Sequence, residues 1–383
     1  MSHQLSRFAL MSGNFITGIS VLAPAGMLPE LSSGLGVTIR DAGLLVTYGA
    51  VILCFGSPVL SWTTRMGRRM LLTGTLAIVA AGHLASAFAD TYAAILLIRI
   101  AMLVVVALYT PQAASTIALI VPEKDRAGAL AFAFLGWSMA IAVGLPLITL
   151  LATQFGWRET YLVIGVTAAA VALLNAVAIP RGLRGYPLSL QSFAEIARSK
   201  TLLLILLITL FQMSGQFSIT VYMAPVLQRL ADAGPGAAGI FFSILGVASL
   251  VGNIIATNIV GCLGVPRTLT IFMLSMACGS LIWAVSGGIL PAMAIGMFLL
   301  GLGITSANSM QQARLIEAGP ALASATVALN TSFLYFGQAL GSASASILFD
   351  HGYYRAIGFV AVIFFLAAFA TFRLTESWRK RHQ

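Results

Sequence analysis

Long apolar runs separated by short polar stretches dominate the hydropathy pattern of this chain. A helix that crosses the hydrocarbon core of a bilayer needs about 20 residues that are mostly apolar. Runs of that length recur along the sequence, and many contain glycine or proline, which membrane helices tolerate. The pattern predicts twelve transmembrane helices, at about residues 8–29, 42–63, 71–89, 93–120, 127–152, 159–179, 201–227, 238–262, 268–287, 289–312, 321–348 and 353–373.

The composition supports an all-α polytopic membrane protein. Of the 383 residues, 59% are hydrophobic and 8% are charged, whereas soluble domains carry about 25% charged residues. A water-soluble fold with so little charge could not cover its own surface. The three cysteines lie in apolar stretches, and their number and spacing predict neither a disulfide framework nor a metal site.

The basic residues predict how the chain is oriented. The net charge is +10, and the lysines and arginines lie mainly in short segments between apolar runs. If the N-terminus is cytoplasmic, sixteen basic residues fall inside and four outside, with Arg99 left within a span. Because cytoplasmic loops carry an excess of Lys and Arg, we expect a multi-pass protein of the bacterial inner membrane with both termini in the cytoplasm.

The chain divides into two similar halves. The longest internal polar stretch lies at about 180–200, with six expected spans on either side. A shift of 197 residues pairs Gly144 with Gly341 and Arg158 with Arg355, which favours an internal duplication. We therefore expect a first six-helix bundle (1–180), a cytoplasmic linker (181–200) and a second bundle (201–383). Transporters built this way bind substrate near the bilayer midplane between the halves.

Four stretches carry a resemblance to a known family. They are GMLPELSSGLGVTIRDAGLLVTYGAV (26–51), GSPVLSWTTRMGRRMLL (56–72), FLGWSMAIAVGLPLITLLATQFGWRETY (134–161) and VYMAPVLQRL (221–230). The chain resembles the major facilitator superfamily and, more narrowly, its twelve-span drug:proton antiporters in the arabinose-efflux-permease-like branch. The resemblance implies the major facilitator fold and transport by rocking of the two bundles.

The resemblance also implies gating positions. The second stretch is similar to the loop signature G-x-x-x-D-R-x-G-R-R, but Thr64 stands where that signature has an acid. A threonine hydroxyl adds no charge, so we expect a weaker contact to hold the cytoplasmic side of the protein closed. The third stretch is expected at the interface between the halves. The gating candidates are Gly56, Thr64, Arg65, Gly67, Arg68, Arg69, Gly136, Gly144 and Pro146.

Acidic residues are absent from the centres of the expected spans, and all eleven fall near span ends or in loops. A proton-driven antiporter needs a group that titrates near neutral pH. The candidates for proton coupling are Glu30 and His83; the alternative for Glu30 is a solvated helix-end acid, and the alternative for His83 is a hydrogen-bonded histidine between helices. Proton antiport therefore follows from the resemblance, and facilitated diffusion stays open.

With no central acid, substrate contacts are expected from amides, hydroxyls and aromatic rings. Arg99 is the one charge within a span, and the resemblance ties it to proton or substrate handling, although it could also snorkel or pair structurally. Each amide could instead hold helices together. The substrate-binding candidates are Asn14, Arg99, Tyr109, Gln112, Gln212, Gln216, Asn308, Gln312, Asn330 and Gln338.

These observations predict a secondary transporter that exports small neutral or weakly cationic solutes, of the drug, sugar or nucleoside type. Its expected partners are the solute, the lipid bilayer and protons, and it is expected to be a monomer without a cofactor. A uniporter or importer of a metabolite, or a membrane sensor of the same fold, remains an alternative. The sequence shows no nucleotide-binding glycine motif and no catalytic cluster, so we do not expect an enzyme.

Overall fold

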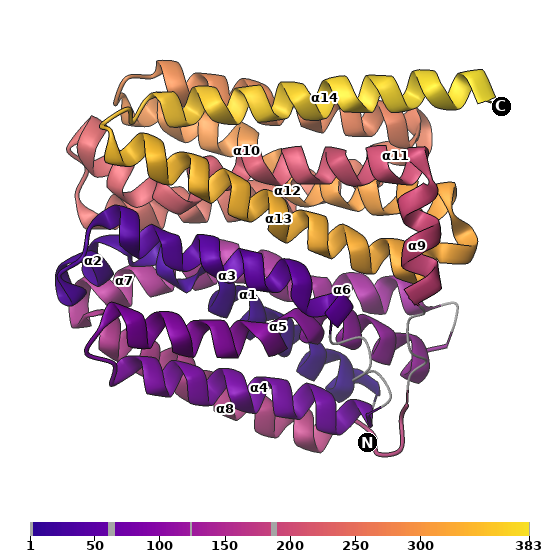
Figure 1. The fold of residues 1–383 in the computed structure, drawn as a ribbon, viewed down its shortest axis with the longest axis horizontal. Helices are drawn as coiled ribbons and strands as arrows, with labels where there is room; N and C mark the ends of the chain where they lie inside the picture. Colours follow the sequence, from indigo (N-terminus) through magenta and orange to yellow (C-terminus); the bar gives the residue numbers. More distant parts are fainter. Residues whose placement is uncertain (1–2, 60–65, 123–124, 185–189, 383) are drawn as a thin grey trace.

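The computed structural model describes residues 3–59, 66–122, 125–184 and 190–382. This part of the chain is built from helices (Figure 1). The elements are α1 (His3–Gly26), α2 (Leu28–Leu35), α3 (Ile39–Val59), α4 (Arg68–Ala87), α5 (Tyr92–Ile120), α6 (Arg126–Met139), η3 (Ala140–Gly144), α7 (Leu145–Phe155), α8 (Trp157–Ala178), α9 (Leu190–Arg198), α10 (Lys200–Ala231), α11 (Pro235–Val285), α12 (Leu290–Ala318), η4 (Pro320–Leu322), α13 (Ala323–Asp350) and α14 (Ala356–His382).

The expected all-α membrane fold is confirmed. Within the described residues, ten helices are long and apolar enough to cross a membrane. One of them, the 51-residue helix α11, contains two expected spans and bends between them at Gly264. Gly264 has a φ of 75°, a conformation that glycine adopts easily. The many Ser, Thr, Asn and Gln residues of α13 lower its hydropathy, although its 28 residues are long enough to span.

One expected span, 127–152, is divided among α6, the π-helical turn η3 and α7. Pro146 is the second residue after this turn and has no N–H to donate to the helix. The backbone N–H of Leu145 reaches the carbonyl of Ala140, five residues back. Such π turns interrupt α-helices at single places, and here the turn lies where the helix meets the second half of the protein.

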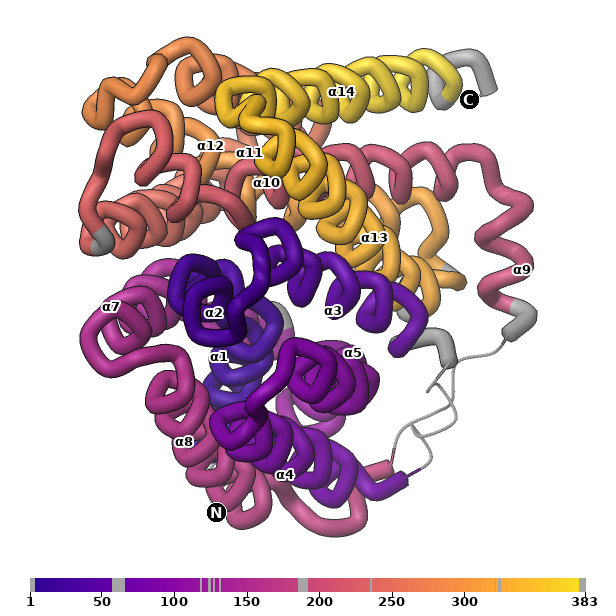
Figure 2. The backbone as a smooth tube through the Cα atoms, turned by 60° about the vertical axis from the view of Figure 1, so that its left-hand side comes forward, coloured from indigo at the N-terminus to yellow at the C-terminus, as the bar shows by residue number. Residues whose placement is uncertain are grey.

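The helices form two groups that lie side by side (Figures 1 and 2). We call α1–α8 the first half and α10–α14 the second half. Across the boundary between them, α3 packs against α13, and α11 packs against η3 and α7. Both chain termini and α9 lie toward one end of the molecule, the right-hand end in Figure 1, which we call the terminal end. The opposite end, where α2 lies, is the distal end.

The two halves are joined at the distal end. Arg40 forms a salt bridge of 2.9 Å with Asp350, and the hydroxyls of Thr47 and Ser342 lie 2.7 Å apart. The Tyr222 hydroxyl donates to the backbone carbonyl of Arg40 over 3.3 Å. These contacts connect α3 to α10 and α13, and we call them together the distal seam.

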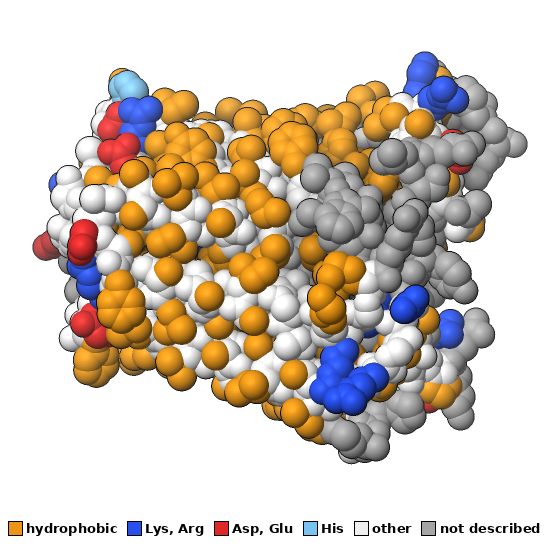
Figure 3. Space-filling view, turned by 60° about the horizontal axis from the view of Figure 1, so that its bottom comes forward, with side chains coloured by type: hydrophobic (Ala, Val, Ile, Leu, Met, Phe, Trp, Pro, Cys, Tyr) orange, Lys and Arg blue, Asp and Glu red, His pale blue; other side chains and the backbone are white. Residues whose placement is uncertain are grey.

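The outer surface has the pattern expected of a protein surrounded by lipid. Figure 3 shows apolar side chains spread over the sides of the molecule, with charged side chains gathered at its two ends. Leu97, Leu173 and Ile363 are examples of large apolar residues that are more than 60% exposed. In water such a surface would associate, so we interpret it as the lipid-facing girdle.

Candidate functional site

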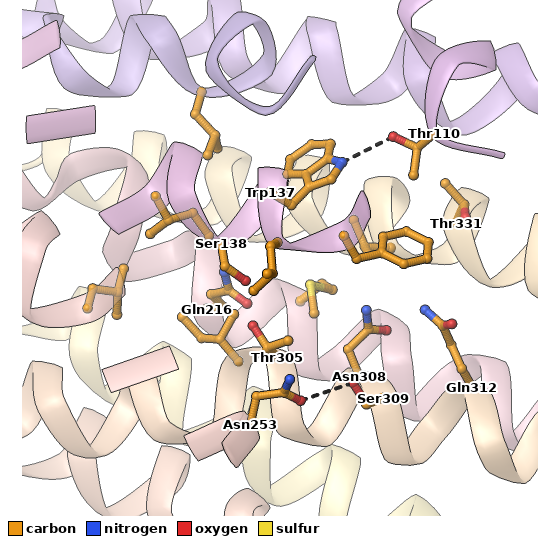
Figure 4. A pocket seen from close by; sticks show the side chains of 18 of the residues that line it. Thr110, Trp137, Ser138, Gln216, Asn253, Thr305, Asn308, Ser309, Gln312 and Thr331 are labelled. Carbon is orange, nitrogen blue, oxygen red and sulfur yellow. Dashed lines mark hydrogen bonds between the residues drawn. The ribbon is translucent and has the colours of Figure 1, made fainter. Parts of the chain in front are cut away.

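A cavity of about 550 Å³ lies between the two halves (Figure 4). The first half lines it from α1, α5, α6, η3 and α7, and the second half lines it from α10, α11, α12 and α13. None of its described lining residues is charged. The polar ones are Thr110, Ser138, Gln216, Thr220, Asn253, Thr305, Asn308, Ser309, Gln312, Thr331 and Tyr335.

The cavity extends toward the terminal end of the molecule. Its lining includes Gly128 in the first turn of α6 and Gln312 in the last two turns of α12, both of which lie at that end. In the other direction it reaches Leu22, close to the end of α1. The contacts of Arg40 with Asp350 and Tyr222 lie at the distal ends of the helices, beyond that point, so the described structure joins its halves on the distal side of the cavity.

The two walls of the cavity differ in chemistry. The first half contributes aromatic rings, including Phe132, Phe134 and Trp137 from α6. The second half contributes all the amides of the described lining, together with the rings of Phe217 and Tyr335, and Figure 4 shows Gln216, Asn308 and Gln312 on the opposite side of the cavity from Trp137. Aromatic rings facing a wall that carries amides can hold a solute that has an apolar face and hydrogen-bonding groups.

Three of the predicted substrate-binding residues line the cavity, namely Gln216, Asn308 and Gln312. A fourth, Asn330, lies behind the wall, where its Nδ2 lies 3.5 Å from Oδ1 of Asn308. Its own Oδ1 accepts a hydrogen bond of 2.8 Å from the Thr209 hydroxyl. Asn330 is therefore in a position to orient the amide of Asn308.

The sequence analysis missed Asn253, Thr305 and Ser309, which also line the cavity. The Ser309 hydroxyl donates to Oδ1 of Asn253 over 3.4 Å. Asn253 lies in the middle of the expected span 238–262, and an amide in the middle of a span was the signal available.

Five predicted contact residues do not line the cavity in the described structure, and their contact with substrate stays a prediction. The Tyr109 hydroxyl donates to Oδ1 of Asn175 over 2.8 Å, within the first half. Gln112, Gln212 and Gln338 are buried and absent from the lining, and each has an amide atom without a hydrogen-bond partner in the described structure. A helix in a bundle presents only one side to a cavity, and residue spacing cannot tell which side. The fifth is Asn14, which lies behind the first-half wall.

Arg99 also lies outside the lining of this cavity, where it bonds to backbone carbonyls. Its Nε donates to the carbonyl of Leu45 over 2.9 Å, and its two Nη atoms donate to those of Ser20 (3.0 Å) and Val21 (2.7 Å). In a helix the carbonyl of residue 20 would accept from the N–H of residue 24, but Pro24 has none. Arg99 thus satisfies a carbonyl that a proline leaves unpaired.

The two candidates for proton coupling lie in different surroundings. His83 is fully buried, its Nε2 lies 2.9 Å from the Ser20 hydroxyl, and its ring stacks on Tyr161. Glu30 lies in a second, smaller cavity of about 80 Å³ that both halves line near the distal end. There the Thr153 hydroxyl donates to Oε1 of Glu30 over 3.2 Å, and burial raises the pKa of the Glu30 carboxyl above its usual value.

Of the gating candidates in the arginine-rich loop, Thr64 and Arg65 fall outside the described residues. Gly67 precedes α4, and the backbone N–H of Arg68, whose side chain is buried, donates to the carbonyl of Leu183 over 2.9 Å. The loop is thereby attached to the segment that follows α8. The side chain of Arg69 is partly exposed, and Gly56 packs closely on Ala107 of α5.

The glycines of the α6–α7 segment contact α1 rather than the other half. A Cβ atom on Gly136 would lie 2.2 Å from the carbonyl oxygen of Met11, and one on Gly144 would lie 2.8 Å from the Ile19 side chain. The close approach across the halves is made instead by Gly246 of α11, whose Cβ would lie 2.1 Å from the Cα of Ala142. Pro146 faces Gly239 of α11 at ordinary contact distance.

Comparison with known proteins decides the family. The sequence model described as Major Facilitator Superfamily matches residues 10–333. The chain belongs to this superfamily. A "Probable sugar efflux transporter" from Mannheimia succiniciproducens is 24% identical over 94% of this chain and 92% of that protein. One of the same description from Helicobacter pylori (strain G27) is 24% identical over 92% of each.

Solved structures of superfamily transporters share the fold. A peptide transporter, solved with sulfate, matches with a TM-score of 0.78 at 14% identity, over 96% of this chain and 94% of its own. A D-xylose-proton symporter matches with a TM-score of 0.75 at 17% identity, over 95% of this chain and 97% of its own. Like other members of the superfamily, the protein is a transporter and not an enzyme.

Proposed function

We propose that this transporter exports small uncharged solutes with several hydroxyl groups, of the sugar type. The observation that carries the proposal is the cavity between the halves, which has aromatic rings, amides on the second-half wall and no charge on its described lining. A charged substrate would enter such a cavity without a counter-charge, at a high desolvation cost. The relatives described as probable sugar efflux transporters support the same class of substrate.

We propose further that the terminal end faces the cytoplasm, in the inner membrane of a bacterium. The excess of Lys and Arg assigned to that side supports this orientation. The described structure is then an inward-open state, with its distal seam on the periplasmic side. Export requires the distal seam to separate while the terminal end closes, which is the rocking movement of two bundles about a central site.

We infer that protons, if they drive export, act at Glu30. This carboxyl lies where the halves meet, between α2 and α7 on one side and α10 and α11 on the other. Its ionisation would change the stability of the distal seam. The absence of acids from the described cavity lining equally supports a uniporter, which is the alternative that the experiment must separate.

The test uses purified protein in two steps. Thermal stabilisation is measured first against arabinose, xylose, methyl α-D-glucopyranoside, uridine and a lipophilic cation, and we expect a shift with one or more of the sugars. Uptake of the shifting sugar into inverted membrane vesicles is then measured with and without an inward-acidic pH gradient. Accumulation against a concentration gradient supports antiport, and equilibration without accumulation supports the uniporter. A shift with the cation alone would overturn the substrate class.

A further inference from the structure

A chain of hydrogen bonds connects the cavity wall to the interior of the first half. The indole Nε1 of Trp137 donates to the hydroxyl oxygen of Thr110 over 3.1 Å (Figure 4). This hydroxyl donates to Oδ1 of Asn14 over 2.9 Å. Nδ2 of Asn14 then donates to the backbone carbonyl of Ala133 over 3.0 Å. The chain therefore joins α6, α5 and α1 and returns to α6 one turn before Trp137.

The indole ring is also supported sterically. A Cβ atom on Gly18 of α1 would lie 3.2 Å from Cε3 and 3.4 Å from Cδ2 of Trp137, so the ring lies against a position where α1 has no side chain. Asn14 is 1% exposed, and both groups of its amide are used within the chain of bonds. Only Trp137 and Thr110 of the four residues line the cavity.

We propose that Trp137 is a specificity-determining residue whose ring orientation is fixed by Thr110 and Asn14 as positioning residues. This inference rests on the proposed function and identifies the part of the solute that Trp137 recognises. A fixed indole face offers a large, rigid apolar surface at little cost in conformational entropy. It selects solutes that have a ring with an apolar face and hydroxyl groups at its edge, which reach the amides opposite. Acyclic polyols, which have no such face, gain little from it.

The orientation of the ring can be read without any ligand. Full-length protein is labelled with 5-fluorotryptophan, and the ¹⁹F resonance that Trp137→Phe abolishes identifies the indole. We expect Thr110→Val to shift or broaden this resonance and Thr110→Ser to preserve it. The resonances of the other four tryptophans should not change, which shows that the variant folds. Thr167→Val is the matched control, because the Thr167 hydroxyl bonds only to its own helix in the described structure.

Binding is measured on the same variants with xylose, methyl α-D-glucopyranoside and sorbitol. Loss of one hydrogen bond is worth about 1 kcal/mol, or about fivefold in affinity. We expect Thr110→Val to weaken the binding of the two cyclic probes by about that factor and to leave the binding of sorbitol unchanged. In the Trp137→Phe background, we expect Thr110→Val to have no further effect on binding.

The outcomes separate this inference from the proposed function. An unchanged Trp137 resonance in Thr110→Val overturns the positioning role, whether or not any sugar binds. A changed resonance with equal losses for cyclic and acyclic probes, or with the same loss in the Trp137→Phe background, overturns the specificity role. If neither cyclic probe binds the wild type, the sugar class of substrate fails, and the resonance alone still decides the positioning role.

Discussion

Replacing Arg99 by Met tests the role that the structure gives to this buried arginine. Methionine has a similar length and no charge, so the variant removes three hydrogen bonds to carbonyls without leaving a large void. The carbonyls of Val21 and Leu45 stand opposite residues 25 and 49, which have backbone N–H groups to donate. The carbonyl of Ser20 stands opposite Pro24 and has no such partner.

The expected loss of stability follows from that difference. A buried carbonyl left without a partner costs about 1–3 kcal/mol, and the removal of a buried charge returns part of its desolvation cost. We therefore expect Arg99→Met to lower the free energy of unfolding by no more than about 3 kcal/mol. The more specific expectation concerns Pro24→Ala, which restores the N–H that Ser20 lacks. This substitution should recover about 1 kcal/mol in the Arg99→Met background, and substantially less in the wild type.

The assay is a double-mutant cycle, with reversible unfolding followed in mixed detergent micelles. We expect a coupling energy between Arg99→Met and Pro24→Ala of about 0.6–2 kcal/mol, a range that begins at the average measured for hydrogen bonds between membrane helices. Pro225→Ala provides the control, because Pro225 lies inside α10 of the other half and should combine additively with Arg99→Met. If the effects of Pro24→Ala and Arg99→Met on the free energy of unfolding add within about 0.3 kcal/mol, the reasoning is refuted. Arg99 would then act through something other than the Ser20 carbonyl.

Three further expectations concern the two cavities and the boundary between the halves. Burial raises the pKa of the Glu30 carboxyl above 4.5 in this state, so the state with a closed distal side is stabilised by this group at low pH and loses that stabilisation as the pH rises through the raised pKa. The accessibility of cysteines introduced at the distal end should therefore increase over that pH range. Glu30→Gln should remove this pH dependence. Asn308→Ala should weaken binding of the stabilising sugar about fivefold, measured by titration, without lowering the melting temperature. Gly246→Ala places a Cβ 2.1 Å from the Cα of Ala142 and should lower the free energy of unfolding by about 1–3 kcal/mol, whereas Gly261→Ala, in open space on the same helix, should not.

The transmembrane helices could be predicted from the sequence because hydropathy depends on local composition. The runs that predicted the spans correspond to the long helices, and even the bend in α11 falls at Gly264, in the short break between two expected spans. Which amides line the cavity was harder to predict. The helical repeat shows that Gln212 and Gln216 share a face of the helix, but it does not show whether that face points to the cavity or to a neighbouring helix. Gln216 lines the cavity and Gln212 does not, which depends on packing across the halves.

Arg99 illustrates a different limit. The sequence offered no acid near it, and a buried charge is usually explained by an opposite charge. Its partners are backbone carbonyls, which every residue has and which therefore leave no pattern in the sequence. The missing N–H of Pro24 was nevertheless visible. Proline inside a predicted span identifies the carbonyl four residues earlier as needing a donor, and this rule would have connected α1 to Arg99.

The separation of the uncharged cavity from Glu30 has a consequence for how transport could be driven. When a carboxylate lies in the binding cavity, substrate and proton compete for one group, and the empty carrier must carry that group from one side to the other. Here the described cavity lining has no charge, while Glu30 lies in the smaller cavity that both halves line near the distal end. A proton on Glu30 would therefore alter the balance between the two states without altering the contacts of the solute. Binding and coupling would then be separable by mutation, since Asn308→Ala acts on the first and Glu30→Gln on the second.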